Sequence, residues 1–456
     1  MEHDKRDETN ETETTKMTET TRADRVADAV LQKFTRLEKK FKPRENEWVP
    51  LSGVVLELDG ELECVALGTG MKCLPAAKVP LAKGCVLHDC HAEVLATRGF
   101  NCFLLHLCRH LKENPTAISR YLTRTPENPQ PYTINHKAEM APWSSPWPPN
   151  EDSTPWTFPT PGSTSNGSPT PNPAPDSGAL PATVPHPNPA PDSGVFPSTP
   201  IDGCEAPSSS GGRPSLTLTI PSLPSSTDTP PISPISPNTH LRGRGYFSAL
   251  GLVRTKPGRG DAPPTASKSC SDKFSLRQVL SLLLSPTCHI ISPENAYIHS
   301  LIIPSSQYTR SGCHRAFSAE GRMASLSGRS WDGGYAFRPF DIETTDLEFE
   351  FSKRLGGAGS SNISAVLIDG VGEEALINGV KQGRKAFSRN MPGSASLVSK
   401  YKIWKMAGEV EEKVTEGFKG YAEMKEALGI REGVKQEARE ALGGWIRNGG
   451  NDWGLN

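Results

Sequence analysis

The sequence lacks the features that mark secreted and membrane proteins. None of its ten cysteines forms a Cys-x-x-Cys pair, and their scattered spacing does not indicate a disulfide framework. No run of 18 apolar residues predicts a membrane span, and no apolar segment precedes a cleavage site near the first residue. We therefore expect an intracellular protein with reduced thiols, in the nucleus, the cytoplasm or both.

The chain also lacks a net charge that would identify its partner. Lys and Arg number 50 against 51 Asp and Glu, which gives a formal net charge of −1. Nucleic-acid binding can therefore be inferred only from local clusters of basic residues. Much of the proline, 42 residues in all, lies in one central block of the 456-residue chain. Without that block and the polar start, roughly 320 residues remain, enough for one large catalytic domain.

Composition divides the chain into four parts. Residues 1–22 are rich in Thr, Glu and Asp and are expected to be disordered. Residues 142–240 have no apolar periodicity, and Pro-Asn-Pro-Ala-Pro-Asp-Ser-Gly occurs there twice, at 171–178 and 187–194. This composition predicts an extended, disordered insertion, with binding to an SH3 or WW module as a weaker alternative. The insertion separates residues 23–141 from 241–456, whose motifs belong together.

The two flanking parts show alternating strand and helix patterns. Before the insertion, apolar spacing predicts a helix from residue 24, strands over 53–58 and 62–67 joined by an Asp-Gly turn, and a helix over 91–111. After it, the pattern predicts helices over 275–284, 396–410 and 421–446, with strands over 296–303 and 366–368. Such alternation is typical of a three-layer α/β architecture.

The tripeptide His91-Ala92-Glu93 carries the first chemical signal. It matches the His-x-Glu half of the zinc-deaminase signature, in which the histidine binds zinc and the glutamate handles protons without binding the metal. Zinc lowers the pKa of water towards neutrality, so a carboxylate two residues from the ligand can move the released proton. Alone the tripeptide is a weak signal, because it also occurs on solvated helix surfaces.

A second segment, residues 256–261 followed by Ser-Cys-Ser-Asp-Lys at 269–273, is far more specific. With it, the chain resembles the deaminase domain shared by the tRNA adenosine deaminases and the double-stranded-RNA editing deaminases. Further matching segments favour the tRNA branch, especially its fungal members. They lie at 48–53, 68–75, 308–323, 333–337 and 378–385. The resemblance covers residues 24–110 and 242–455.

The resemblance implies both fold and activity. The fold would be a cytidine-deaminase-like three-layer α/β/α sandwich with a C-terminal α-rich extension. The activity would be zinc-dependent hydrolytic deamination of adenosine to inosine in tRNA, at position 37 of alanine tRNA. Carried over by position, His91 and Cys270 would bind Zn²⁺ and Glu93 would be the catalytic proton shuttle.

The same family encloses inositol hexakisphosphate in a basic interior cavity. The resemblance places seven residues of this chain on or near it: Arg98, Lys273, Arg277, Lys400, Tyr421, Lys425 and Trp445. Thr97, Arg447 and Asn448 depart from the residues that the double-stranded-RNA editors carry there. For tRNA contact, the basic stretch from Arg242 to Arg259 suits phosphate binding, and we expect Lys72, Lys256 and Arg259 to contact RNA.

One motif of the family is missing. Its other zinc-binding cysteine comes from Pro-Cys-Gly-Asp-Ala on a strand-to-helix turn, but this sequence contains no Pro-Cys dipeptide. The expected region is 132–156, where residues 136–147 read His-Lys-Ala-Glu-Met-Ala-Pro-Trp-Ser-Ser-Pro-Trp. Cys204 lies well beyond it, and Cys73, Cys90 and Cys288 occupy positions that are not ligands in the family. Two protein ligands would hold zinc poorly, so the sequence predicts substoichiometric zinc.

Two explanations of this gap stay open, an error in the sequence across residues 125–160 and a true loss of the motif. A true loss would favour a second function, a non-catalytic RNA-binding paralogue that keeps the fold and the polyanion. The retained Glu93 argues against that function, because a protein without catalysis has no need of a proton shuttle. A third function is an adaptor that acts through its proline-rich insertion.

Overall fold

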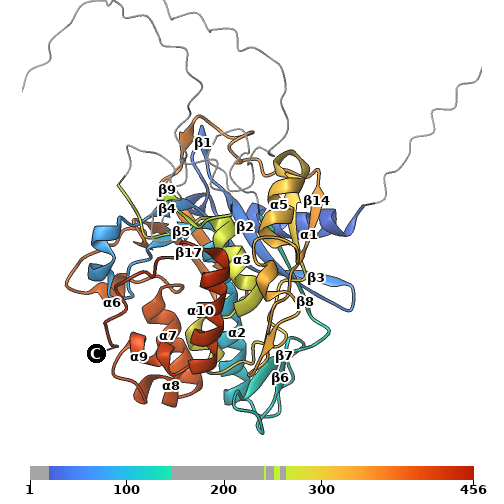
Figure 1. Cartoon of the computed structure of the whole chain (residues 1–456). Helices are drawn as coiled ribbons and strands as arrows, with labels where there is room; N and C mark the ends of the chain where they lie inside the picture. The colour runs from blue at the N-terminus through green and yellow to red at the C-terminus, as the bar shows by residue number, and fades with distance from the viewer. Residues whose placement is uncertain (1–19, 145–240, 243–250, 257–262, 456) are drawn as a thin grey trace, which may run out of the picture. The chain divides into compact units, whose positions relative to one another are not determined.

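A computed structural model describes residues 20–144, 241–242, 251–256 and 263–455, all in one compact unit (Figure 1). The first 19 residues and most of the proline-rich insertion lie outside the described residues. The folded part begins slightly earlier than composition predicts, because Thr21 caps helix α1 (Arg22–Thr35). It also continues past the expected boundary at residue 141, since Pro142 to Ser144 belong to strand β8 (Glu139–Ser144).

An eight-stranded mixed sheet forms the centre of this unit. Its order is β14-β11-β8-β2-β3-β16-β17-β18. The first three strands, β14 (Asp341–Thr345), β11 (Ser300–Pro304) and β8, run parallel. The others pair antiparallel: β2 (Leu51–Leu58), β3 (Glu61–Thr69), β16 (Ser364–Ile368), β17 (Gly372–Ile377) and β18 (Val380–Lys381). The alternating sequence pattern thus correctly indicated a mixed α/β structure.

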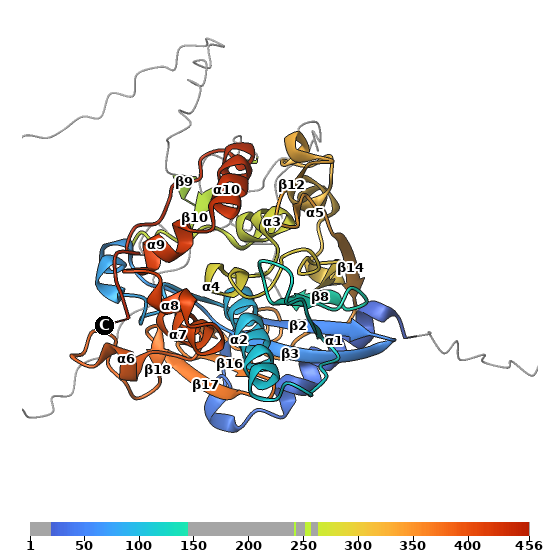
Figure 2. The same ribbon diagram turned by 90° about the horizontal axis from the view of Figure 1, so that it is seen from below.

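Helices cover both faces of the sheet (Figure 2). Helix α1 packs Val26, Val30 and Phe34 against one face, in a core cluster with Leu51 and Leu67. Helix α2 (Ala92–Glu113) covers the other face, in a second cluster that contains strand residues from β2, β3 and β16. Both helices were expected from their apolar spacing, and the turn between β2 and β3 lies at Asp59-Gly60 as expected.

The remaining helices follow the insertion. They are α3 (Cys270–Leu280), α4 (Ser285–Cys288), α5 (Arg310–Phe317), α6 (Met391–Ser394), α7 (Lys400–Val410), α8 (Lys413–Glu416), α9 (Tyr421–Glu426) and α10 (Gly429–Leu442). The expected single helix over 421–446 is therefore two helices that end by Leu442. Helix α3 begins five residues before the predicted start and ends where Ser281 adopts a positive φ of 59°. None of the described helices is both long and apolar enough to cross a bilayer.

Short strand pairs complete the described structure. Those near the site are β4 (Met71–Cys73) with β5 (Asp89–His91), and β9 (Leu241–Arg242) with β10 (Arg254–Thr255). The others are β1 (Glu47–Trp48) with β15 (Gly359–Ser360), β6 (Leu122–Arg124) with β7 (Tyr132–Ile134), and β12 (Ser330–Trp331) with β13 (Tyr335–Ala336).

Candidate functional site

His91 lies where strand β5 ends and helix α2 begins. It is the N-cap residue of α2, and the N–H of the next residue, Ala92, donates to the carbonyl of Gly70. This junction lies against β3 because Gly68 has no side chain. A Cβ at that position would come within 2.6 Å of the Ala92 carbonyl oxygen and 2.7 Å of Leu95 Cβ. The glycine-rich end of β3 thus fixes the position of the histidine.

The β4–β5 ladder groups three side chains that can bind a metal. Cys73 pairs with Asp89, and Met71 with His91, so these side chains share one face of the ladder. Cys73 Sγ lies 3.5 Å from His91 Nδ1, which in turn lies 2.8 Å from Asp89 Oδ1. The ligand atoms of Cys73, Asp89 and His91 all lie within 4.8 Å of one another. Sequence reasoning had set Cys73 aside, because its position is not a ligand in the family.

Glu93 and Cys270 meet at the N-termini of two helices. Glu93 is in the first turn of α2 and Cys270 is the first residue of α3, and the Glu93 carboxylate adds to the effect of burial in raising the pKa of the Cys270 thiol. Lys256 Nζ donates to Glu93 Oε1 at 3.5 Å and lies 3.7 Å from Asp89 Oδ2. Cys270 is not part of the group formed by Cys73, Asp89 and His91. The expected residues Glu93 and Cys270 are therefore adjacent, with Lys256 beside them.

Electrostatics keeps Glu93 charged and His91 neutral. Burial acts to raise the pKa of Glu93, but the positive charge of Lys256 and the influence of His91 outweigh it, and the pKa lies below its ordinary value. Burial and Lys256 lower the pKa of His91, so its imidazole is neutral and able to bind a metal. Burial raises the pKa of the Cys270 thiol to about 12. That thiol would lose its proton only on binding a metal.

Asp89 connects this group to Lys273. Its Oδ2 atom accepts hydrogen bonds from the Lys273 ammonium and the Ser267 hydroxyl, while its Oδ1 atom accepts the His91 backbone N–H at 2.9 Å. Burial acts to raise the pKa of Asp89, but Lys256 and Lys273 outweigh it and the pKa lies well below its ordinary value. The fully buried Asp89 carboxylate therefore stays ionised, and its contacts with the backbone and ring of His91 orient that residue.

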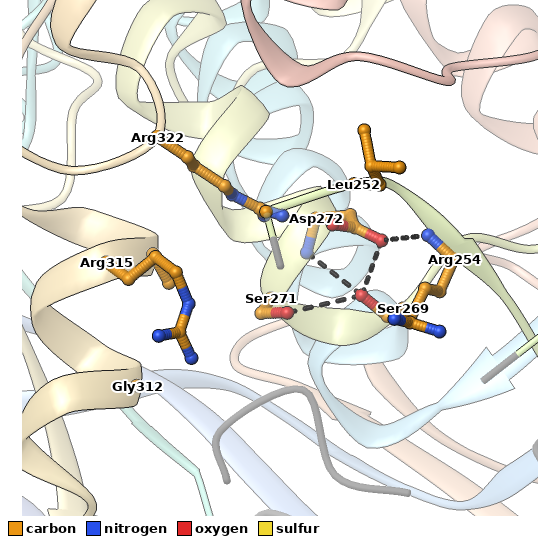
Figure 3. A pocket seen from close by; sticks show the side chains of 10 residues that line it. Leu252, Arg254, Ser269, Ser271, Asp272, Gly312, Arg315 and Arg322 are labelled. Carbon is orange, nitrogen blue, oxygen red and sulfur yellow. Dashed lines mark hydrogen bonds and ion pairs between the residues drawn. The ribbon is translucent and has the colours of Figure 1, made fainter. Parts of the chain in front are cut away.

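Hydrogen bonds and one ion pair around Asp272 fix the start of α3 (Figure 3). This helix begins at Cys270. Asp272 accepts the Ser269 hydroxyl at 2.6 Å and the Arg254 backbone N–H at 3.0 Å. Arg322 Nη1 pairs with the other oxygen of Asp272 at 2.5 Å, and both side chains are largely buried. Arg322 also donates to Ser275 in the second turn of the helix. The cysteine is thus held by its own helix cap and by one arginine.

Basic side chains gather on the far side of Asp89. Lys400 Nζ lies 5.6 Å from the ring centroid of Tyr421, and Lys400 and Arg98 line one cavity with Asp89. Burial, Lys425 and Arg98 together lower the pKa of Lys400 to about 7. Burial and Arg431 lower the pKa of Arg277 to about 9. Burial and repulsion between neighbouring cations therefore both disfavour the charged forms of these residues, which sequence reasoning assigned to an inositol phosphate.

Four cationic members of this cluster were missed: Lys268, Arg431, Lys435 and Arg439. Three of them recur every four residues on α10, a periodic signal that the sequence did contain. Lys268 Nζ lies 5.8 Å from the Trp445 ring, and burial and Lys273 lower its pKa to about 8. Burial and Lys425 lower the pKa of Lys435 to about 7. These positions place Trp445, Lys425 and Lys273 in the same basic cluster.

Orphaned donors within the cluster test whether a polyanion fits. Arg98 Nη2, Arg431 Nε and two nitrogens of Arg439 are buried and have no hydrogen-bond partner. A buried charged donor without a partner costs free energy, and several in one cluster cost more. An anion with many acceptor oxygens would satisfy them together. The described residues therefore fit a polyphosphate.

The expected RNA contacts have different surroundings. Lys72 is opposite Cys90 on the β4–β5 ladder, and its Nζ donates to Ser360 at 3.2 Å. Together with Cys73 and Phe387 it lines a cavity of about 420 Å³. Lys256 lies inside the site, with 12% of its side chain exposed, so it would meet tRNA only there. Arg259 is outside the described residues. Of the region 132–156, where the missing motif was sought, only residues 132–144 are described.

Known proteins similar to this chain agree on one activity. Residues 66–153 match the family model of the adenosine-deaminase (editase) domain. The chain is 31% identical over 443 residues to tRNA-specific adenosine deaminase 1 of Schizosaccharomyces pombe, covering 94% of this chain and 95% of the relative. It is 25% identical to the proteins of the same name from Saccharomyces cerevisiae (84% and 82% covered) and Homo sapiens (93% and 98% covered).

Proposed function

Because the chain belongs to the tRNA-specific adenosine deaminase 1 family, we propose that it converts adenosine to inosine in tRNA by zinc-dependent hydrolysis, at position 37 of alanine tRNA. The observation that carries the proposal is the placement of His91 and Glu93 at the N-terminus of α2, with Lys256 Nζ 3.5 Å from Glu93 Oε1. We also propose that the mixed sheet and its helices form the cytidine-deaminase-like sandwich of this family. The parts flanking residues 145–240 would then make one deaminase domain.

The residues present fit a zinc ion. His91 is neutral, and Cys270 would lose its thiol proton on binding the metal. His91 and Cys270 would hold the ion. When bound, zinc supplies the Lewis acidity that activates a water molecule as a nucleophile near neutral pH.

Glu93 is the residue that would move protons. Its lowered pKa leaves it ionised, so it can accept the proton released by the attacking water. It would donate that proton to N1 of the purine, and a further proton to the leaving amine, so that water and adenosine give inosine and ammonia. Lys256, 3.5 Å from Glu93 Oε1, would orient the carboxylate throughout. A target adenosine in an anticodon loop is single-stranded, so little free energy is needed to bring it into the site.

The basic cluster would hold inositol hexakisphosphate as a structural cofactor. Its orphaned arginine donors and its lysines with lowered pKa values support this assignment. Lys273 lies between the metal site and the basic cluster, because it donates a hydrogen bond to Asp89 and its charge acts on Lys268. The polyanion would thus stabilise Asp89, and through it His91.

Conversion of a defined tRNA tests the proposal. Purified protein is incubated with anticodon stem-loops that carry adenosine or guanosine at the target position, and inosine is measured by mass spectrometry. We expect inosine in the first RNA, and expect Glu93→Gln to abolish it while zinc content is unchanged, because Glu93 is not a ligand. Tight tRNA binding without conversion by the zinc-loaded wild type would instead support the non-catalytic RNA-binding paralogue, which the missing Pro-Cys motif favours.

A further inference from the structure

A second thiol lies at the site, on a strand that sequence reasoning did not connect with zinc. Cys73 is the last residue of β4, and its Sγ atom lies 3.5 Å from His91 Nδ1. A zinc ion with ordinary bond lengths to a thiolate and an imidazole, at a tetrahedral angle, separates the two ligand atoms by about 3.6 Å. The spacing of these two atoms already matches that of a ligand pair.

We propose that Cys73 binds zinc together with His91 in this chain and supplies the thiolate that the missing Pro-Cys motif would otherwise provide. One histidine and two cysteines form the ligand set of the zinc deaminases, with a fourth position for water. This inference rests on the proposed function, since it concerns the metal of that same site.

Asp89 would position His91 without binding the metal itself. Its Oδ2 atom is engaged by Lys273 and Ser267, and its Oδ1 atom holds the His91 backbone N–H. With His91 Nδ1 bound to zinc, the backbone hydrogen bond remains and the ring keeps its orientation. Cys73 is directly opposite Asp89 on the ladder, so the strand pairing that places His91 also places the thiol.

Cobalt substitution of the full chain tests this assignment, because cobalt bound by thiolates absorbs in proportion to their number. We expect two-thiolate absorption per metal in the wild type and about half of it in Cys73→Ser. We also expect the zinc affinity of Cys73→Ser, measured by competition with a chelator, to fall at least about 100-fold, the upper end of what outer-shell changes cost. Cys90→Ser is the matched control: Cys90 lies between Asp89 and His91 but belongs to the other face of the ladder, so both readings should stay at the wild-type level.

The outcomes separate this site from the proposed function. Unchanged cobalt absorption and zinc affinity in a folded Cys73→Ser protein would overturn the assignment, as would their loss in Cys204→Ser instead. The melting temperature of each variant establishes that it is folded. Inosine formation that persists in Cys73→Ser refutes the ligand role and leaves the deaminase intact. Two-thiolate cobalt binding in a chain that forms no inosine supports the ligand role and refutes the activity.

Discussion

Lys256 Nζ lies 3.5 Å from Glu93 Oε1, and the two side chains are 12% and 9% exposed. Since Lys256 is the strongest influence that lowers the pKa of Glu93, replacing it with Met should raise that pKa. Glu93 must be ionised to accept a proton, so activity is lost as pH falls through its pKa. The acid limb of the pH–kcat/KM profile should therefore move to higher pH in Lys256→Met. Lys256→Arg keeps the charge and should leave the limb nearly in place; an identical limb in both variants contradicts the role.

The Arg322–Asp272 pair should contribute strongly to stability. Both side chains are largely buried, and Asp272 also accepts a hydrogen bond from Ser269, the residue that caps the helix beginning at Cys270. Arg322→Ala leaves a buried carboxylate without its ionic partner, which costs about 3–5 kcal/mol of unfolding free energy. Urea denaturation measures the loss. The control is Arg329→Ala, whose half-exposed pair with Glu437 should cost less than about 1 kcal/mol.

Patterns among neighbouring residues predicted the helices, strands and turns well. They did not predict which side chains far apart in the sequence come together. The helix at Val26–Phe34 and the turn at Asp59-Gly60 follow from spacing and turn chemistry, which depend on adjacent residues. Cys73 could not be found in this way, because its approach to His91 depends on the register of β4 against β5. That register brings together two residues 18 positions apart in the sequence, which no local spacing rule predicts.

The basic cluster shows a similar limit. Arg431, Lys435 and Arg439 have a visible four-residue period, but solvated helix surfaces commonly carry the same pattern. What distinguishes them is burial beside Lys425 and Arg98, which only the packed structure reveals. The resemblance had supplied Lys400 and Tyr421 by position, and the structure places those two side chains together.

Removal of the polyanion should make stability depend on pH. Without it, Lys400 and Lys435 have pKa values of about 7 in the folded protein, below their ordinary value of 10.5. The unfolded chain then binds more protons between pH 7 and 10.5, so the stability of the anion-free protein rises with pH across this window. Bound inositol hexakisphosphate keeps both lysines charged and should abolish that rise. Melting temperatures at pH 7 and 9, with and without the ligand, provide the measurement; the same rise in both would exclude a shared polyanion site.

Inositol hexakisphosphate should also copurify with the protein. Mass spectrometry of the denatured protein is expected to detect about one equivalent, and Lys273→Ala should lower the soluble yield, because a buried phosphate loses a partner. Lys405→Ala is the control, since this exposed lysine of α7 lies outside the cluster. Well-folded protein that contains no polyanion would contradict the assignment.

Deletion of residues 160–235 should leave stability nearly unchanged. The composition of this segment offers no apolar core, and the free-energy cost of closing a loop changes only slowly with its length. Urea denaturation of the deleted and full-length chains should give unfolding free energies that agree within about 1 kcal/mol. A cooperative loss of folding would show that the segment is packed.

Gly68→Ala tests whether close packing of β3 against α2 positions the metal ligands. The added Cβ would meet the Ala92 carbonyl oxygen at 2.6 Å and Leu95 Cβ at 2.7 Å, so backbone must shift. Overpacking of this kind costs about 1–3 kcal/mol. Because Ala92 follows His91, the shift should also weaken zinc binding, measured by chelator competition. Gly433→Ala in α10 is the matched control, because its Cβ would meet nothing within 4 Å and should add roughly 0.4–1 kcal/mol of stability. Loss of stability in Gly68→Ala with unchanged zinc affinity would separate the packing from the metal site.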